Sequence, residues 1–538
     1  IMIILLACHL IQVVIAGAYR TPRELNWWFG LILMKLTLGL SLTGYLLPWD
    51  EKGYWATQTS TKIIGITPII GPFLQTLLVG GVSYGHQTLT RFFALHAGLL
   101  PALFILTLVV HVALFRKQGV THPKNTQRKA YFWPSQALLD LGASLAVLSI
   151  IVFLVIWGGF EQGIVLGVES GANLQAPAAP DEPYSAARPE WYFLFLFQFL
   201  KYFPGSLEVV GAIIIPSLVV GLLFLFPLIA RLPKGHAFCR WTTLVLMGSI
   251  LLLTGLSMWS DSIDPAYQKA VADAEIKAKR SIELANHKGI PKEGAIALLR
   301  SDPLSRGPYL FQTHCSVCHR WNGHDGTDSQ IVNSSETALR DPKHLSTKPV
   351  SANLKASDLG GFGTQRWISE FLKDPSNNKF FGHTKLHNSD MANWSKQNIP
   401  LMSEEEINDV SWFLSSQAQL PNKTPISSEV VERGAEIFSF GSWDGAQPCS
   451  DCHRLDYPNI PATKNMVSAP DLTRYASEEW LLGMILDPTQ TKYYGPTKNE
   501  MPKFLERLTS KEAHLIAKWL RRDWFSAHQK NLSDTSLQ

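Results

Sequence analysis

Long apolar runs fill the first half of the chain, whereas the second half carries most of the charged residues. The hydrocarbon core of a bilayer is about 30 Å thick, so a helix that crosses it needs roughly 20 apolar residues. Six runs meet this length fully or nearly, and they predict membrane helices at residues 1–18, 27–47, 92–115, 138–157, 209–230 and 241–259. Because the sequence is already apolar at residue 1, we expect the chain to start within a membrane helix.

Basic residues are unevenly distributed between the loops that would join these helices. The loops on one side hold most of the Lys and Arg, while loops 48–90 and 158–208 on the other side hold only four. In membrane proteins the cytoplasmic loops carry the excess of basic residues. The pattern therefore predicts that the last helix delivers everything after residue 260 to the opposite compartment, the p-side.

An internal repeat organises the polar half of the chain. Residues 261–300, rich in Ala, Lys and Glu, predict a linker. After the linker, the same spacing occurs twice. A Trp is followed by an Asp seven positions later and by a Gly eight positions after that, at Trp367, Asp374 and Gly382 and again at Trp480, Asp487 and Gly495. Each copy ends in a predicted helix with a capping signature. The capping pairs are Ser403 with Glu406 and Ser510 with Glu512.

The predicted fold class is all-α. A transmembrane helix bundle would occupy residues 1–260, the linker 261–300, and two small all-α domains 301–420 and 421–538. Over the 538 residues the net charge is only +4, and no basic stripe interleaves with aromatic residues. Nucleic acid is therefore not expected as a partner.

Four of the six cysteines lie in two Cys-x-x-Cys-His motifs. In such a motif the two cysteines can form thioether bonds to a haem, and the histidine can bind the haem iron. A zinc site is the alternative, but neither copy contains the second cysteine pair that it would need. We predict two covalent c-type haems, held by Cys315, Cys318, His319, Cys449, Cys452 and His453.

A c-type haem that carries electrons at high potential needs a sixth ligand, and methionine raises the potential. Met501 precedes Pro502 just before the last predicted helix, and Met391 occupies the same position in the first copy. The repeat predicts that His319 pairs with Met391, and His453 with Met501. The alternatives in the first copy are Met402, His383 and His387.

Three histidines, His9, His96 and His111, lie within predicted membrane helices. An ionisable residue at that depth is costly and indicates a function, although a single histidine can also be a packed core residue. His96 and His111 are 15 residues apart, so they face broadly the same way and lie about 22 Å apart along the helix axis. This geometry predicts two stacked b-type haems. His9 would share one with His111, and the partner of His96 would lie about four turns before His9, upstream of residue 1.

Two glycines on the second predicted helix support this arrangement. Gly30 and Gly44 lie 14 residues apart and therefore nearly on one face. Without a side chain, these positions let a planar ring approach the backbone, although glycines also serve helix packing in membranes.

Four segments of the membrane half carry specific motifs. They are Gly44-Tyr-Leu-Leu-Pro-Trp49, Thr88-Leu-Thr-Arg-Phe-Phe-Ala-Leu-His96, Pro189-Glu-Trp-Tyr192 and Phe199-Leu-Lys-Tyr-Phe-Pro-Gly205. Through them, nearly all of residues 1–260 resembles the cytochrome b of the Rieske/cytochrome b quinol:electron-acceptor oxidoreductases. The histidine spacing of 15 residues is similar to the chloroplast and Gram-positive branch. Residues 301–538 resemble a fused dihaem cytochrome c.

The resemblance implies that the loop around Glu190 lines a quinol oxidation site on the p-side. Glu190 would take a proton from quinol, and Tyr45 and Tyr192 would line the same pocket. One electron would pass to a Rieske iron–sulfur protein and on to the c haems, and the other through the b haems to a second quinone. A structural role for Glu190, pairing with Arg188, is the alternative. The remaining implied cofactor contacts are Arg91, Pro189 and Trp191.

The implied cofactors are two haem b, two haem c and a quinone. Because all four cysteines outside the membrane half lie in haem motifs, the Rieske protein would be a separate partner. Further expected partners are a cytochrome b segment or subunit supplying the missing helix and histidine, a soluble or membrane electron acceptor, lipid, and a second copy in a homodimeric complex. The expected location is a bacterial energy-transducing membrane, with the c domains on the p-side.

Two other functions stay open at this stage. A passive electron conduit would have the same haems without quinol chemistry, and it would not need the Pro189-Glu-Trp-Tyr192 motif. A membrane-anchored dihaem peroxidase would need an open haem position, which two methionines in matching places argue against.

Overall fold

The regular secondary structure of the described residues is almost entirely helical, as predicted. The structure, a computed structural model, describes residues 2–119, 131–160, 164–165, 168–169, 175–327, 355–421, 426–458, 469–494 and 499–526. The exception among these residues is an antiparallel pair of two-residue strands, β1 (Ile164–Val165) and β2 (Val168–Glu169). The chain divides into two compact units, Ile1–Ile282 and Glu283–Gln538.

The first unit contains the membrane helices. In chain order they and their connections are α1 (Met2–Ile15), α2 (Glu24–Tyr45), α3 (Glu51–Gly65), α4 (Gly71–Val79), α5 (His86–Ala94), α6 (Leu100–Gln118), α7 (Ala137–Phe160), α8 (Leu194–Leu200), α9 (Ile215–Ile229), α10 (Gly235–Ile263) and α11 (Pro265–Lys288). Within the described part of the chain, five helical segments are long and apolar enough to cross a membrane. They correspond to five of the six predicted spans, so the protein is a multi-pass membrane protein. The sixth, at residues 1–18, contains the shorter apolar helix α1.

The packed core of the first unit joins four of these helices. Its buried residues come from α1, α2, α9 and α10 and from the turn after α1: Val14, Tyr19, Trp27, Leu31, Leu223, Phe226, Ala230 and Cys239. One polar contact inside this core has a clear cause. Pro227 has no N–H, so the carbonyl of Leu223, four residues earlier, lacks its usual helical donor. The indole Nε1 of Trp27 donates to that carbonyl at 2.8 Å and so satisfies it.

The second unit is built from short helices. In chain order these are α12 (Ile296–Arg300), α13 (Pro303–His314), α14 (Gln365–Lys373), α15 (Asp390–Asn398), α16 (Glu404–Gln417), α17 (Ser428–Phe440), α18 (Glu478–Leu486) and α20 (Ser510–Leu520). The capping pair of Ser403 with Glu406 is present as predicted. At α20, however, the N-cap is Thr509 and not Ser510. The reciprocal bonds need a spacing of three residues, which Thr509 has to Glu512 and Ser510 does not.

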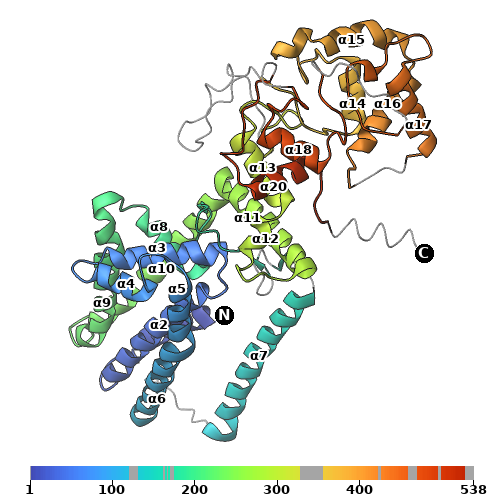
Figure 1. Ribbon diagram of the computed structural model, residues 1–538. Helices are drawn as coiled ribbons and strands as arrows, with labels where there is room; N and C mark the ends of the chain where they lie inside the picture. The colour runs from blue at the N-terminus through green and yellow to red at the C-terminus, as the bar shows by residue number, and fades with distance from the viewer. Residues whose placement is uncertain are drawn as a thin grey trace. The chain divides into compact units, whose positions relative to one another are not determined.

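The second unit contains two large hydrophobic cores and a smaller cluster of Leu284, Leu298 and Leu299. The first combines α13 with α18 and α20, and the second combines α14 and α16 with α17. Figure 1 shows the two groups, with α13, α18 and α20 gathered in one place and α14 to α17 in another. Each core draws residues from both copies of the sequence repeat. The cores therefore group the helices differently from the predicted division into domains 301–420 and 421–538.

Replacing Trp27 with Phe should destabilise the first unit, because it leaves the Leu223 carbonyl without a donor in an apolar core. A buried unsatisfied acceptor costs about 1–3 kcal/mol. The measurement is the thermal unfolding midpoint of the detergent-solubilised protein. Trp28→Phe is the matched control: Trp28 donates to the Phe224 carbonyl at 2.9 Å, but Leu228, four residues on, keeps its N–H. Equal destabilisation by both variants would contradict the role given to Pro227.

Candidate functional site

The histidines of the two Cys-x-x-Cys-His motifs have equivalent surroundings. The Nδ1 atom of His319 lies 2.8 Å from the Ser357 carbonyl oxygen, and Nδ1 of His453 lies 2.8 Å from that of Pro470. A carbonyl can only accept, so Nδ1 carries the proton and Nε2 carries the lone pair that binds a metal. Burial lowers the pKa of both imidazoles, so both are neutral at pH 7. This is the form and orientation that an iron ligand requires.

The cysteines also fit covalent haem. Cys315 and Cys449 each pack against one of the two hydrophobic cores, and burial raises the pKa of both thiols to about 12. A flat apolar macrocycle attached there would lie against apolar side chains. Among the described residues, no group of three or more His, Cys, Asp or Glu side chains converges as a metal site. The donor set therefore fits haem c better than the zinc alternative.

The sequence repeat is also a repeat in three dimensions. After each motif the same backbone bond forms: Leu359 N donates to Arg320 O in the first copy, and Leu472 N donates to Arg454 O in the second, both at 2.8 Å. The repeated tryptophans then donate to corresponding carbonyls. Trp367 Nε1 lies 3.0 Å from Asp358 O, and Trp480 Nε1 lies 3.1 Å from Asp471 O. Gly495, the last residue of the predicted register, lies outside the described residues.

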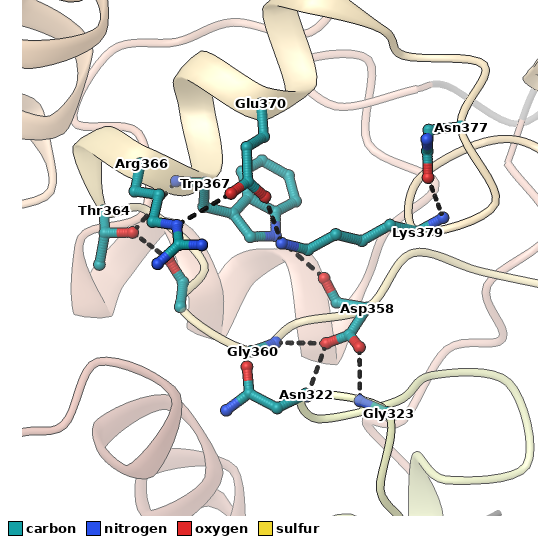
Figure 2. Close-up of polar contacts among 11 residues, drawn as sticks. Asn322, Gly323, Asp358, Gly360, Thr364, Arg366, Trp367, Glu370, Asn377 and Lys379 are labelled. Carbon is teal, nitrogen blue, oxygen red and sulfur yellow. Dashed lines mark hydrogen bonds and ion pairs between the residues drawn. The ribbon is translucent and has the colours of Figure 1, made fainter.

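Asp358 organises the turn that follows the first motif (Figure 2). Its Oδ1 accepts from the backbone N–H groups of Asn322 at 2.8 Å and Gly360 at 2.7 Å, and its Oδ2 accepts from Gly323 at 2.8 Å. The carboxylate thereby ties the chain after His319 to the chain before α14. Sequence reasoning missed this residue, although an Asp-Leu pair precedes the repeated Trp by nine residues in both copies.

A second polar group in Figure 2 steadies α14. Glu370 lies between Lys379 and Arg366, with its Oε1 2.9 Å from Arg366 Nε. Hydrogen bonds from Lys379 and then Arg366 lower the pKa of Glu370. All three side chains are partly or largely exposed, so the group contributes little stability.

The candidate sixth ligands lie in different cores from the histidines with which the repeat pairs them. Met501 packs against the core that contains Cys315, whereas Met391 and Met402 pack against the core that contains Cys449. The grouping differs from the predicted pairs, His319 with Met391 and His453 with Met501. His383 and His387 are exposed side chains, which does not fit a ligand to a buried haem.

In the membrane half, two predicted histidines face the two predicted glycines. A Cβ atom on Gly44 would lie 2.7 Å from His96 Cε1, and one on Gly30 would lie 3.3 Å from His111 Cε1. The Nδ1 atom of His96 lies 3.0 Å from Leu40 O, and that of His111 lies 3.1 Å from Asn26 O. His9 on α1 interacts electrostatically with His111 and therefore lies near it. The donor set of paired imidazoles fits haem b.

The predicted p-side residues gather where α2 ends. The Tyr45 hydroxyl donates to Arg188 O at 3.3 Å. Burial raises the pKa of Tyr192, a hydrogen bond with Ser41 opposes this shift, and the Glu190 carboxylate adds to it. Glu190 caps the short helix Trp191–Phe193 and lies 3.7 Å from Lys52 Nζ, with both side chains about one-third exposed. A pair with that exposure contributes little stability.

The alternative partner of Glu190, Arg188, is occupied elsewhere. Its Nε and Nη2 atoms both lie 3.1 Å from Asp261 Oδ1, and its guanidinium lies over the rings of Phe197 and Tyr267. Arg91, a predicted cofactor contact, donates to the Leu77 carbonyl. Pro189 and Trp191 flank Glu190 directly.

Replacing Asp358 with Asn should destabilise the second unit, because one amide oxygen cannot replace two carboxylate oxygens that accept from three backbone N–H groups. Leaving one of these donors unsatisfied costs about 1–3 kcal/mol. The thermal midpoint, followed through the haem absorption, measures the effect. Asp374→Asn is the control, because Oδ1 of that residue accepts from an exposed donor, Ser376 N. An unchanged midpoint for the Asp358 variant would remove this residue from the site's framework.

The two halves of the chain match different families of known proteins. Residues 1–164 match the family described as Cytochrome b(N-terminal)/b6/petB, and residues 304–418 match the family Cytochrome c. A cytochrome bc complex cytochrome b subunit from Chlorobaculum thiosulfatiphilum is 36% identical over 208 residues, which is 38% of this chain and 46% of that protein. Cytochrome b6 from Gracilaria tenuistipitata var. liui is 43% identical over 122 residues, covering 23% of this chain and 57% of its own length.

The chain thus spans about half the length of the curated relatives it matches. A solved structure titled "Hyperthermophilic respiratory Complex III" is 24% identical and covers 51% of this chain and 71% of that one, with a TM-score of 0.39, which is too low to support an argument. The two family matches imply haem b and haem c as cofactors. One polypeptide therefore joins a region that matches the cytochrome b N-terminal/b6 family to a region that matches the cytochrome c family.

Proposed function

We propose that the chain is the cytochrome b/c fusion subunit of a quinol:acceptor oxidoreductase, with a quinol oxidation site on the p-side. The observation that carries the proposal is that one turn of α2, residues 41–45, meets both a haem-ligand candidate and the candidate quinol site. Thr43 Oγ1 lies 3.2 Å from His96 Nδ1, and Gly44 lies against the same imidazole. Ser41 bonds to Tyr192, and Tyr45 bonds to the loop before Glu190.

Glu190 has the chemistry and the access needed to take a proton from quinol. Its charge acts on both Tyr192 and Tyr45, and its ion pair with Lys52 is a weak contact. Lys52 Nζ also lies 6.0 Å from the Tyr45 ring, so a single cation connects the two candidate residues. A positioned carboxylate contributes about 10²–10⁴-fold to proton transfer. Because about one-third of the Glu190 side chain is exposed, the proton can pass on to water.

The cofactors and partners follow from the same assignment. His96 and the pair His9 and His111 would hold two b haems, and the two Cys-x-x-Cys-His motifs two c haems, all of which supply one-electron acceptors when bound. A Rieske iron–sulfur protein would take the other electron from quinol, and an upstream segment or another subunit would supply the partner of His96. The relative's name, a cytochrome bc complex subunit, supports a multi-subunit assembly. We place the c domains on the p-side and expect a homodimer that delivers electrons to a soluble or membrane acceptor.

A passive electron conduit is the second candidate, because it would need the same haem ligands. It gives no reason for Glu190, Tyr45 and Tyr192 to gather beside His96. A dihaem peroxidase is less well supported, because a methionine packs against the same core as Cys315 and another against the same core as Cys449.

Glu190→Gln separates quinol oxidation from passive conduction. The amide keeps the shape but cannot accept the proton, so quinol-driven reduction of the b haems should slow by at least about tenfold while all haems stay bound. The measurement combines the reduction rate with the haem spectrum. Glu182→Gln, in the same loop but paired with Lys277 at 2.9 Å, is the control and should keep the full rate. Full-rate reduction in a haem-loaded Glu190 variant would favour the passive conduit.

His111→Ala tests the ligand assignment in the membrane. The variant should lose one b haem and keep both c haems, because His111 is the residue facing Gly30. A pyridine haemochrome spectrum counts b and c haems separately. The control is His236→Ala, since His236 bonds to the Tyr19 hydroxyl at 3.0 Å and not to the α2 face. Unchanged b haem content in the His111 variant would refute the assignment.

A further inference from the structure

The first and last helices of the two sequence copies are paired crosswise. In each copy the first helix carries the same motif, Arg306-Gly-Pro-Tyr-Leu-Phe311 and Arg433-Gly-Ala-Glu-Ile-Phe438. A Cβ on Gly307 would lie 2.4 Å from Trp519 Cβ, and one on Gly434 would lie 2.7 Å from Phe413 Cβ. Phe413 and Trp519 are equivalent, because each lies ten residues after the N-cap of its helix. The first helix of each copy therefore packs against the last helix of the other copy.

Each candidate methionine packs against the same core as the last helix of its own copy. Met501 and Cys315 pack against the core formed by α13, α18 and α20, together with Leu359. Met391 and Cys449 pack against the core formed by α14, α16 and α17, together with Leu472.

Direct bonds hold the segment with Met391 beside the second motif. Trp394 Nε1 donates to Gln447 O at 3.2 Å, and Gln447 N donates to Asn398 Oδ1 at 2.7 Å. Gln447 lies two residues before Cys449. The charge of Asp390, next to Met391, also acts on Cys452.

The chain passes between the two cores at one pair of tight turns. Gly363, with φ of +78°, lies so close to Ala476 that a Cβ there would be 2.7 Å from the Ala476 Cβ. Arg521, the residue after α20, binds both segments: its Nη1 donates to Ala476 O at 2.9 Å and to Ala418 O at 2.6 Å. Phe362 beside the turn packs against both cores. Gly363 lies between α13 of one core and α14 of the other, and Ala476 lies between α17 and α18 in the same way. Each copy of the repeat therefore crosses from one core to the other at its turn.

We propose that the two c-type haem sites are exchanged between the copies. The haem bound by Cys315, Cys318 and His319 takes Met501 as its sixth ligand, and the haem bound by Cys449, Cys452 and His453 takes Met391. Thioether sulfur opposite imidazole is the ligand set of a high-potential cytochrome c. Neither copy alone contains a complete haem site, so each c haem needs residues of both copies. The proposal does not depend on the quinol site.

Removing one haem makes the exchange measurable. In the full chain, Cys315→Ala with Cys318→Ala leaves the second c haem alone. On that background Met391→Ala should abolish the methionine–iron absorption signature and lower the reduction potential, while Met501→Ala should leave both unchanged. Met402→Ala, in the same core as Met391, is the control and should also leave them unchanged. Loss with Met501→Ala, or with Met402→Ala in place of Met391→Ala, overturns the assignment.

An ion pair tests the crossed helices without removing any haem. Arg433 Nε on α17 lies 2.7 Å from the buried Oδ2 of Asp409 on α16. Arg433→Gln and Asp409→Asn should each lower the thermal midpoint. In the exchanged arrangement, the double variant should lose less than the sum of the two single losses. Arg306 is the equivalent residue of the first copy, so Arg306→Gln with Asp409→Asn should be additive. Additivity for Arg433 and coupling for Arg306 would mean that each copy folds on its own, and the proposal would fail.

Discussion

The membrane half depends on how closely α2 can approach the helix that carries His96 and His111. Two glycines make this approach possible: any side chain at Gly44 would overlap the His96 ring, and one at Gly30 would press on His111. The carbonyls of Leu40 and Asn26 on α2 then bond to the two imidazoles and fix their orientation. An imidazole held in this way presents its other nitrogen in a fixed direction, which a metal ligand requires. The positions of Ser41 and Tyr45, and with them the candidate quinol site, follow from the same helix.

The features that depend on local sequence could be predicted. Membrane spans follow from apolar length alone, and five of the predicted spans are present. The two haem motifs, the histidine spacing and the glycine face are likewise properties of a few neighbouring residues or of a single helix. The N-cap of α20 was misassigned by one residue, because Thr509 and Ser510 are both good caps and only the spacing to Glu512 separates them.

Features that depend on the choice between two similar partners could not be predicted. Both copies have a glycine on the first helix and an aromatic residue on the last, so either pairing of helices satisfies the pattern. The structure favours crossed pairs because α17 follows α16 after only ten residues, and neighbouring elements in a chain usually pack together. The partner of Arg188 could not be predicted for the same reason. Glu190 is only two residues from Arg188 in the sequence, but the guanidinium binds Asp261, which lies far along the chain.

The clamp between Arg188 and Asp261 explains how Glu190 remains available for chemistry. The guanidinium makes several charge-assisted bonds to one buried carboxylate and stacks on Phe197 and Tyr267, so the loop is anchored two residues before Glu190. Had Arg188 paired with Glu190, the carboxylate would have been held by a strong partner and would resist protonation. Lys52 at 3.7 Å, with about one-third of its side chain exposed, exerts a weaker hold. An anchored loop that carries one weakly held carboxylate beside two tyrosines suits the proposed removal of a proton from quinol, and this anchoring depends on α10 supplying Asp261.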